Sequence, residues 1–164
     1  MRSDPESHVT LALKSSPDFL AVYGSLMRAE GMQTTLGVAG YLQFVAEIRV
    51  PGELFDLGEF PGLRLVGAGS PLAVPAELFA ILNPRALDLL DEYEGCQEDA
   101  QGSSVFVRRR LRLLEPPVEV WVYLWQGGVK NCPRVRGMSW PEHKARRSSI
   151  PPASPPAMLQ DDAL

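Results

Sequence analysis

The chain has 164 residues and a mass of 18.0 kDa, the size of one domain, which excludes a two-domain enzyme. Apolar residues make up 45% and charged residues 22%, as expected of a chain that buries a core, and the 14 glycines and 15 prolines favour short strands and turns over a helical bundle. The net charge of −4 gives no general attraction to phosphate backbones, so nucleic acid is not an expected partner.

The sequence contains no recognisable targeting, membrane or metal signal. The first 16 residues carry scattered charges and lack the apolar core of a secretory signal, so we expect a cytoplasmic protein. No apolar run approaches the roughly 20 residues of a bilayer-spanning helix, so we expect no membrane partner. Cys96 and Cys132 do not form a CxxC pair, and with two histidines they do not make a standard zinc set. We therefore expect neither a metal nor a catalytic cysteine.

Both ends of the chain differ in composition from the middle. Residues 1–17 are polar and mixed, and predict a loose leader. Residues 141–164 are rich in proline, serine and alanine, a composition too poor in apolar residues to offset its ordering entropy, and predict a disordered tail. One domain over residues 18–140 is expected between them.

The first half of this domain reads as strands. Residues 19–23 form a short apolar strand that Gly24 closes with a tight turn. A short helix follows in the stretch 26–36, although Gly31 weakens it by about 1 kcal/mol relative to alanine. Further strands are expected over residues 38–50, 53–57, 63–66 and 73–82.

The second half carries the best-marked helix. Asn83 and Pro84 form a helix start, and Gly95 lies where a left-handed C-terminal cap is expected, so the helix should run from Pro84 to about Glu94. Two long strands over 105–114 and 118–125 follow. The predicted fold is α+β: a small mixed or antiparallel β-barrel of about six strands with one or two flanking helices.

One face of this helix carries a candidate general acid/base. Leu87, Leu90, Asp91 and Glu94 share a stripe that the leucines turn toward the core. Burial and the negative end of the helix dipole should both raise the pKa of Glu94, which suits proton transfer near neutral pH. The alternative is a solvated acid or the partner of an arginine. Asp91 could equally bind a neighbouring loop, and Glu92 is expected to be solvated.

The turn after the first strand is a candidate anion site. Glycine lets the backbone of Val22 to Leu26 come close to a ligand, and successive N–H groups at a strand end bind carboxylates. The alternative is an ordinary sharp turn. Ser25 as a nucleophile is disfavoured because it needs a histidine, and His8 and His143 lie in the ends predicted to be loose.

The last two strands each have one polar or aromatic face. Alternation places Phe106, Arg108, Arg110 and Arg112 on one side of their strand, away from Val107 and Leu111. The basic run is either a solvated face or a patch for an acidic partner, and Arg108 is a possible carboxylate contact. Trp121, Tyr123 and Trp125 share a face that either packs or walls a pocket.

Several motifs together resemble the gamma-glutamylcyclotransferase family, which includes AIG2-like and gamma-glutamylamine cyclotransferase-like proteins. The motifs are YGSL at 23–26, LFDLGEFPGL at 54–63, LFAI at 78–81, LDEYEG at 90–95 and WVYL at 121–124, and the resemblance covers roughly residues 19–125. Their order and spacing carry more weight than any single motif.

The resemblance implies an enzyme, independent of any metal or cofactor, that releases 5-oxoproline from a small gamma-glutamyl compound. It implies substrate binding by Val22, Tyr23, Gly24, Ser25 and Leu26, with Phe106 and Arg108 nearby, and Glu94 as the acid/base. Family members commonly carry Tyr-x-Arg where this chain has Phe106-Val107-Arg108, so a phenol donor is missing. The alternative function is a catalytically weak domain that binds a carboxylate or a partner. The sequence leaves open which gamma-glutamyl compound is used and whether the chain is a monomer or a homodimer.

Overall fold

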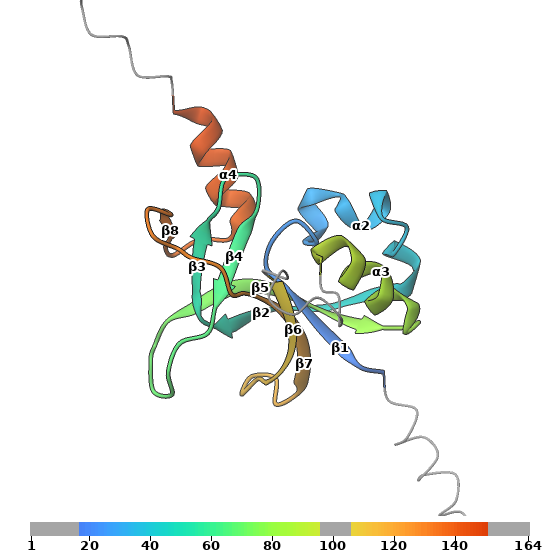
Figure 1. Ribbon diagram of the computed structural model, residues 1–164. Coiled ribbons are helices and arrows are strands. Elements are labelled where there is room, and N and C mark those ends of the chain that lie inside the picture. The colour runs from blue at the N-terminus through green and yellow to red at the C-terminus, as the bar shows by residue number, and fades with distance from the viewer. Residues whose placement is uncertain (1–16, 96–105, 151–164) are drawn as a thin grey trace, which may run out of the picture.

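The computed structural model describes residues 17–95 and 106–150, in which the strands form two sheets (Figure 1). The larger sheet has the order β2-β5-β1-β7-β6. Its central strand β1 pairs with β5 in antiparallel and with β7 in parallel orientation, so the expected mixed sheet is confirmed. Its strands span Phe19–Val22 (β1), Leu42–Pro51 (β2), Ala73–Ile81 (β5), Phe106–Arg112 (β6) and Glu119–Trp125 (β7).

The smaller sheet has the order β4-β3-β8. Its strands are Glu53–Asp56 (β3), Pro61–Arg64 (β4) and Arg134–Val135 (β8). Strand β4 lies against β7 of the larger sheet, since a Cβ added at Gly62 would lie 2.8 Å from the Cβ of Trp125. The sheets therefore pack together, while closure into a barrel stays a prediction.

Three α-helices cover the sheets in the described part of the chain. Helices α2 (Met32–Thr35) and α3 (Arg85–Glu94) lie near each other, while α4 (Trp140–Ser149) lies beside the smaller sheet (Figure 1). Short 3-10 turns occur at Arg28–Glu30 and Ala39–Tyr41. Helix α3 has the predicted ends: the Arg85 N–H donates to Asn83 Oδ1 at 3.0 Å, and Gly95 caps the helix at φ 72°. None of the helices in residues 17–95 and 106–150 is long and apolar enough to cross a bilayer.

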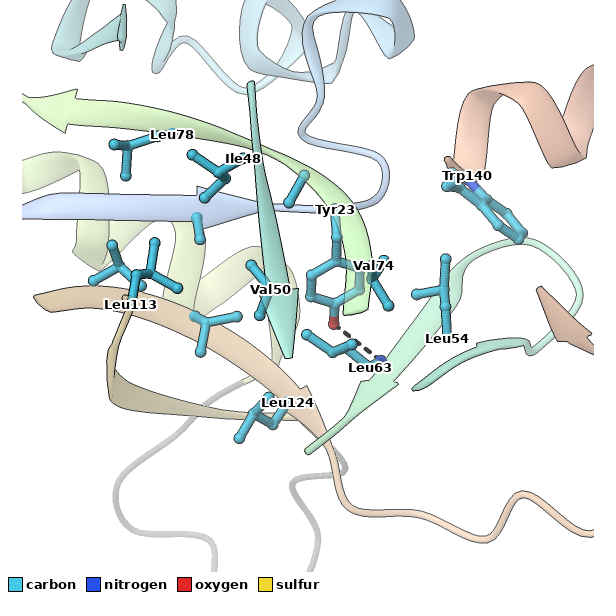
Figure 2. Close-up of a cluster of buried hydrophobic side chains, with 14 of the residues drawn as sticks. Tyr23, Ile48, Val50, Leu54, Leu63, Val74, Leu78, Leu113, Leu124 and Trp140 are labelled. Carbon is cyan, nitrogen blue, oxygen red and sulfur yellow. Dashed lines mark hydrogen bonds between the residues drawn. The ribbon is translucent and has the colours of Figure 1, made fainter. Parts of the chain in front are cut away.

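The larger sheet has an apolar cluster on each face. In β1, Ala21 belongs to the cluster shared with the smaller sheet and α4, whereas Leu20 and Val22 belong to the cluster shared with α3. Figure 2 shows the first cluster, in which Tyr23 lies among aliphatic side chains. Because β1 is buried on both faces, its run of apolar residues is continuous rather than alternating.

Helix α4 corrects the prediction of disorder from residue 141. Residues 141–149 continue this helix, which begins with a capping box: the Ser139 side chain accepts from the Glu142 N–H, and Glu142 accepts from the Ser139 N–H at 2.7 Å. Trp140 fastens the helix to the core and is only 1% exposed. The sequence signal was present, since Ser139-x-x-Glu142 with Pro141 inside it is typical of a helix start. Residues 1–16 of the predicted leader 1–17 and residues 151–164 of the predicted tail lie outside the described residues.

A buried acid holds α4 on the smaller sheet. Asp56 of β3 lies 2.8 Å from His143 Nε2 and accepts two hydrogen bonds from Arg147 Nη1, at 2.8 and 3.0 Å. Burial by itself would raise the pKa of Asp56, but the hydrogen bonds from His143, the Gly58 N–H and Arg147 outweigh it and hold the pKa below its usual value. The helix is therefore docked by charge as well as by Trp140.

Two other boundaries differ from expectation. The strand predicted over 38–50 begins only at Leu42, because residues 39–41 form a 3-10 turn. The two-residue strand β8 was not predicted, and so short a strand has no alternation to detect.

Candidate functional site

A cavity of about 310 Å³ opens where β1 and α3 end. This volume lies within the range of small-molecule sites. The cavity brings together the turn at 22–26, Glu94 and Phe106, three elements singled out in the sequence. Its lining residues are Ala21, Val22, Tyr23, Gly24, Ser25, Leu26, Phe60, Pro61, Tyr93, Glu94, Phe106 and Tyr123.

Tyr23 pins the start of the turn to both sheets. Its hydroxyl donates to the Tyr123 carbonyl oxygen at 2.6 Å. It also accepts from the Leu63 N–H at 3.4 Å, the bond drawn in Figure 2. The ring is only 6% exposed, so both bonds lie in the core. The phenol hydroxyl therefore stabilises the turn through these two hydrogen bonds.

A buried glutamate on β5 fixes the far end of the turn. Glu77 is 5% exposed and accepts from the Arg28 backbone N–H at 2.7 Å and from Arg28 Nε at 2.5 Å. The Arg28 guanidinium stacks on Phe44, 3.4 Å from the ring centroid. The turn is therefore held at both ends before any ligand binds, which is the preorganisation that a binding loop requires.

Between these anchors the backbone presents unused donors. Within the described residues, the N–H groups of Gly24, Ser25 and Leu26 have no hydrogen-bond acceptor, whereas the Gly24 and Leu26 carbonyls are both bonded. Such consecutive donors at a strand end can bind an anion or a carbonyl oxygen that gains charge. Glycine is required at 24 because an added Cβ would lie 2.6 Å from Cγ of Pro61.

Glu94 occupies the last turn of α3 and is half-buried. Burial raises the pKa of its carboxyl from 4.5 to about 7. Among the described residues no hydrogen bond or ion pair to the carboxylate offsets this effect. Glu92, one position round the helix, is exposed as predicted. Of the three carboxylates near the end of α3, only Glu94 lines the cavity, and its raised pKa suits proton exchange with a molecule there near neutral pH.

Arg108, a predicted substrate contact, is not among the residues that line the cavity. Its Nη2 donates to Asp91 Oδ2 at 2.9 Å, and its Nε lies 2.9 Å from Asp91 Oδ1. The Tyr123 hydroxyl donates to the same Oδ1 at 2.7 Å. Asp91 therefore binds strands β6 and β7 rather than a loop. Its bonds lock the last turn of α3, and with it Glu94, onto the sheet.

The cavity also has an aromatic part, of which the sequence predicted Phe106 but not Phe60 or Tyr93. Phe60, Tyr93 and Phe106 line it, and Trp125 packs behind Phe106 with ring centroids 5.1 Å apart. Phe60 comes from the β3–β4 turn. It is part of the motif LFDLGEFPGL at residues 54–63, which by itself does not indicate a residue of a pocket. The alternating face of β7 was the one signal that pointed to Trp125 and Tyr123.

The contacts of His143 do not support a serine nucleophile. His143 contacts Asp56 rather than Ser25, so it does not activate that hydroxyl. Within residues 17–95 and 106–150, no group of three or more histidine, cysteine or acidic side chains is arranged to hold a metal ion. Cys96 lies outside the described residues, and Cys132 is a free, half-buried thiol.

Comparison with solved structures shows the same fold in other organisms. The chain is similar to an uncharacterised protein from Pyrococcus horikoshii (12% identity, TM-score 0.58, covering 80% of this chain and 96% of that one). It is also similar to a uropathogenic E. coli-specific protein, with 20% identity and a TM-score of 0.59 over 79% of this chain and 97% of that one. A third similar structure is an AIG2-like protein from Mus musculus, with 21% identity and a TM-score of 0.55 over 73% of this chain and 86% of that one. At these identities the structures show the shared fold alone.

Sequence comparison supplies the family. None of the curated proteins matches this chain. A family model described as gamma-glutamyl cyclotransferase, AIG2-like, matches residues 20–142, which include both sheets, α2, α3 and the start of α4. The chain belongs to the AIG2-like gamma-glutamyl cyclotransferase family.

Proposed function

We propose that the protein releases 5-oxoproline from a gamma-glutamyl amine or peptide, with Glu94 as general acid/base. The observation that carries this proposal is the meeting of two features in one cavity: a carboxyl whose pKa is raised to about 7, and three backbone N–H groups without an acceptor among the described residues. Membership of the family supports the same reaction.

The reaction needs only groups that the cavity offers. The free α-amine of the gamma-glutamyl group attacks its own side-chain carbonyl carbon, and a five-membered ring forms. The Glu94 carboxylate accepts a proton from the attacking amine and delivers it to the leaving nitrogen as the carbon–nitrogen bond breaks. The amides of Gly24, Ser25 and Leu26 bind the substrate carboxylate or the carbonyl oxygen as it gains charge. Because nucleophile and electrophile are already tethered, positioning supplies much of the rate.

The surroundings of Glu94 fit proton transfer in both directions. An acid with a pKa near 7 is ionised often enough to accept a proton and is acidic enough to return it. Phe106 stands where family members commonly carry tyrosine, so no phenol acts from that position. The proposed mechanism accordingly assigns Phe106 to the apolar wall.

The test is turnover by the purified protein. We expect 5-oxoproline, detected by mass spectrometry, from at least one member of a panel of gamma-glutamyl amines, gamma-glutamyl dipeptides and glutathione. Glu94→Gln should fold normally and release none, whereas Glu92→Gln, in which an exposed acid of the same helix turn is replaced, should retain activity. Substantial turnover by Glu94→Gln would reject the role of Glu94. Binding of these compounds without turnover would favour a carboxylate-binding domain of the same fold.

A further inference from the structure

The cavity presents two partly exposed aromatic rings to a ligand. Phe60 is 39% and Tyr93 38% exposed, although both line the cavity. They come from different elements, the β3–β4 turn and the last turn of α3. Phe60 is held in place by Phe106, with ring centroids 5.8 Å apart, and by Trp125 at 6.3 Å. An exposed ring that is fixed by its neighbours can stack on a ligand at little entropic cost.

Among the described residues that line it, the same cavity has no positive charge. These residues include no lysine, arginine or histidine, and Glu94 is the one acidic residue among them. Arg108, the arginine nearest to Glu94 in sequence, is bound to Asp91. A carboxylate on the leaving group would therefore meet Glu94 and the negative end of α3 without a counter-ion.

The backbone N–H donors and the aromatic rings of the cavity suit two different parts of a substrate. This division rests on the proposed function: the amides of Gly24, Ser25 and Leu26 take the polar gamma-glutamyl part, which leaves the aromatic part of the wall for the amine that departs. We propose that Phe60 and Tyr93 are specificity-determining residues that select gamma-glutamyl amides whose leaving amine carries an aromatic group and no carboxylate.

A matched set of substrates isolates this preference from chemical reactivity. Gamma-glutamyl 4-methylbenzylamide, 4-carboxybenzylamide and 4-(aminomethyl)benzylamide have nearly the same shape and the same benzylic leaving nitrogen but differ in charge. Gamma-glutamyl methylamide lacks the ring. We expect kcat/KM for 5-oxoproline release from the 4-methylbenzylamide and the 4-(aminomethyl)benzylamide to be about tenfold above that for the 4-carboxybenzylamide and the methylamide.

Variants assign the preference to the two rings. Phe60→Ala and Tyr93→Ala should each lower the ratio of kcat/KM for the 4-methylbenzylamide to that for the methylamide by about threefold or more. Phe60→Arg should raise kcat/KM for the 4-carboxybenzylamide relative to the 4-methylbenzylamide, because it adds a counter-ion at the wall. Leu65→Arg is the matched control, since Leu65 is exposed but does not line the cavity, and it should leave that ratio unchanged.

Each outcome decides the question. Turnover of the 4-carboxybenzylamide that equals or exceeds that of the 4-methylbenzylamide overturns the inference, and so do ratios that neither alanine variant alters. If the wider panel of gamma-glutamyl compounds yields 5-oxoproline and none of the benzylamides does, the inference is also overturned. If no compound of either set yields 5-oxoproline, the proposed function fails. The same compounds are then ranked by calorimetric affinity: tighter binding of the 4-methylbenzylamide that depends on Phe60 and Tyr93 supports the aromatic site, and equal affinities overturn it.

Discussion

Replacing Glu94 with glutamine should make the protein more stable while it removes activity. Burial raises the pKa of Glu94 from 4.5 to about 7, so the folded protein holds this proton more tightly than the unfolded chain does. Since one pKa unit corresponds to about 1.4 kcal/mol, the ionised side chain destabilises the fold by roughly 3 kcal/mol at pH 8. The destabilisation is absent below about pH 4, where Glu94 is protonated in both states, and it grows as the pH rises through 7.

Urea unfolding followed by tryptophan fluorescence measures this difference. At pH 8 the midpoint for Glu94→Gln should lie up to about 1.5 M above that of the wild type, and near pH 4 the two should coincide. Glu92→Gln is the matched control, because Glu92 lies in the same helix turn but is exposed, and its midpoint should follow the wild type at every pH. A Glu94→Gln protein that is less stable than the wild type at pH 8, or a difference that does not change with pH, would refute the assignment of Glu94 as a desolvated acid.

Three other predictions concern the site and its support. For the wild type, kcat/KM for 5-oxoproline release should rise as the pH increases through about 7, because Glu94 accepts a proton only when ionised; a profile that is flat from pH 5 to 8 would contradict this role. Gly24→Ala should lower kcat/KM by about tenfold, since its Cβ displaces the turn from Pro61, and Pro61→Ala in the same chain should restore part of the loss. Asp56→Asn should lower the free energy of unfolding by about 3 kcal/mol in urea titrations at pH 7, because it removes the anion that docks α4; an unchanged midpoint would show that Trp140 alone holds the helix.

The elements predicted correctly are those whose signals are local. Asn83 and Gly95 mark the ends of α3 by capping chemistry, which depends on few neighbours. Alternation correctly separated the two faces of β6 and β7. Phe106 and Val107 of β6 belong to different apolar clusters, and so do Val122 and Tyr123 of β7. Helix α4 was not predicted, because the composition of residues 141–164 favours disorder. The four-residue capping motif at residues 139–142, which favours a helix start, is the local signal that was correct.

The partners of charged side chains were not predictable in the same way. Arg108 was expected to contact substrate. A strand run of three arginines indicates only the face on which each side chain lies and does not indicate its partner. Its pairing with Asp91 depends on the position of α3 across the sheet, which no local pattern specifies. The same holds for Phe60, whose ring reaches the cavity only because β4 packs against β7.

The meeting of Glu94 with the turn after β1 follows from strand pairing and element length. Because β5 runs antiparallel to β1, the end of β5 lies beside the start of β1, where the Ile81 N–H donates to the Asp18 carbonyl oxygen. Helix α3 begins four residues later and packs Leu90 into the cluster that contains Leu20 and Val22, so it returns along β1 toward the turn. Its 10 residues span about 15 Å and the 4 residues of β1 about 13 Å, so helix and strand end at nearly the same level. The last turn of a helix of this length therefore lies at the cavity that Gly24 to Leu26 also line, and that turn carries Glu94.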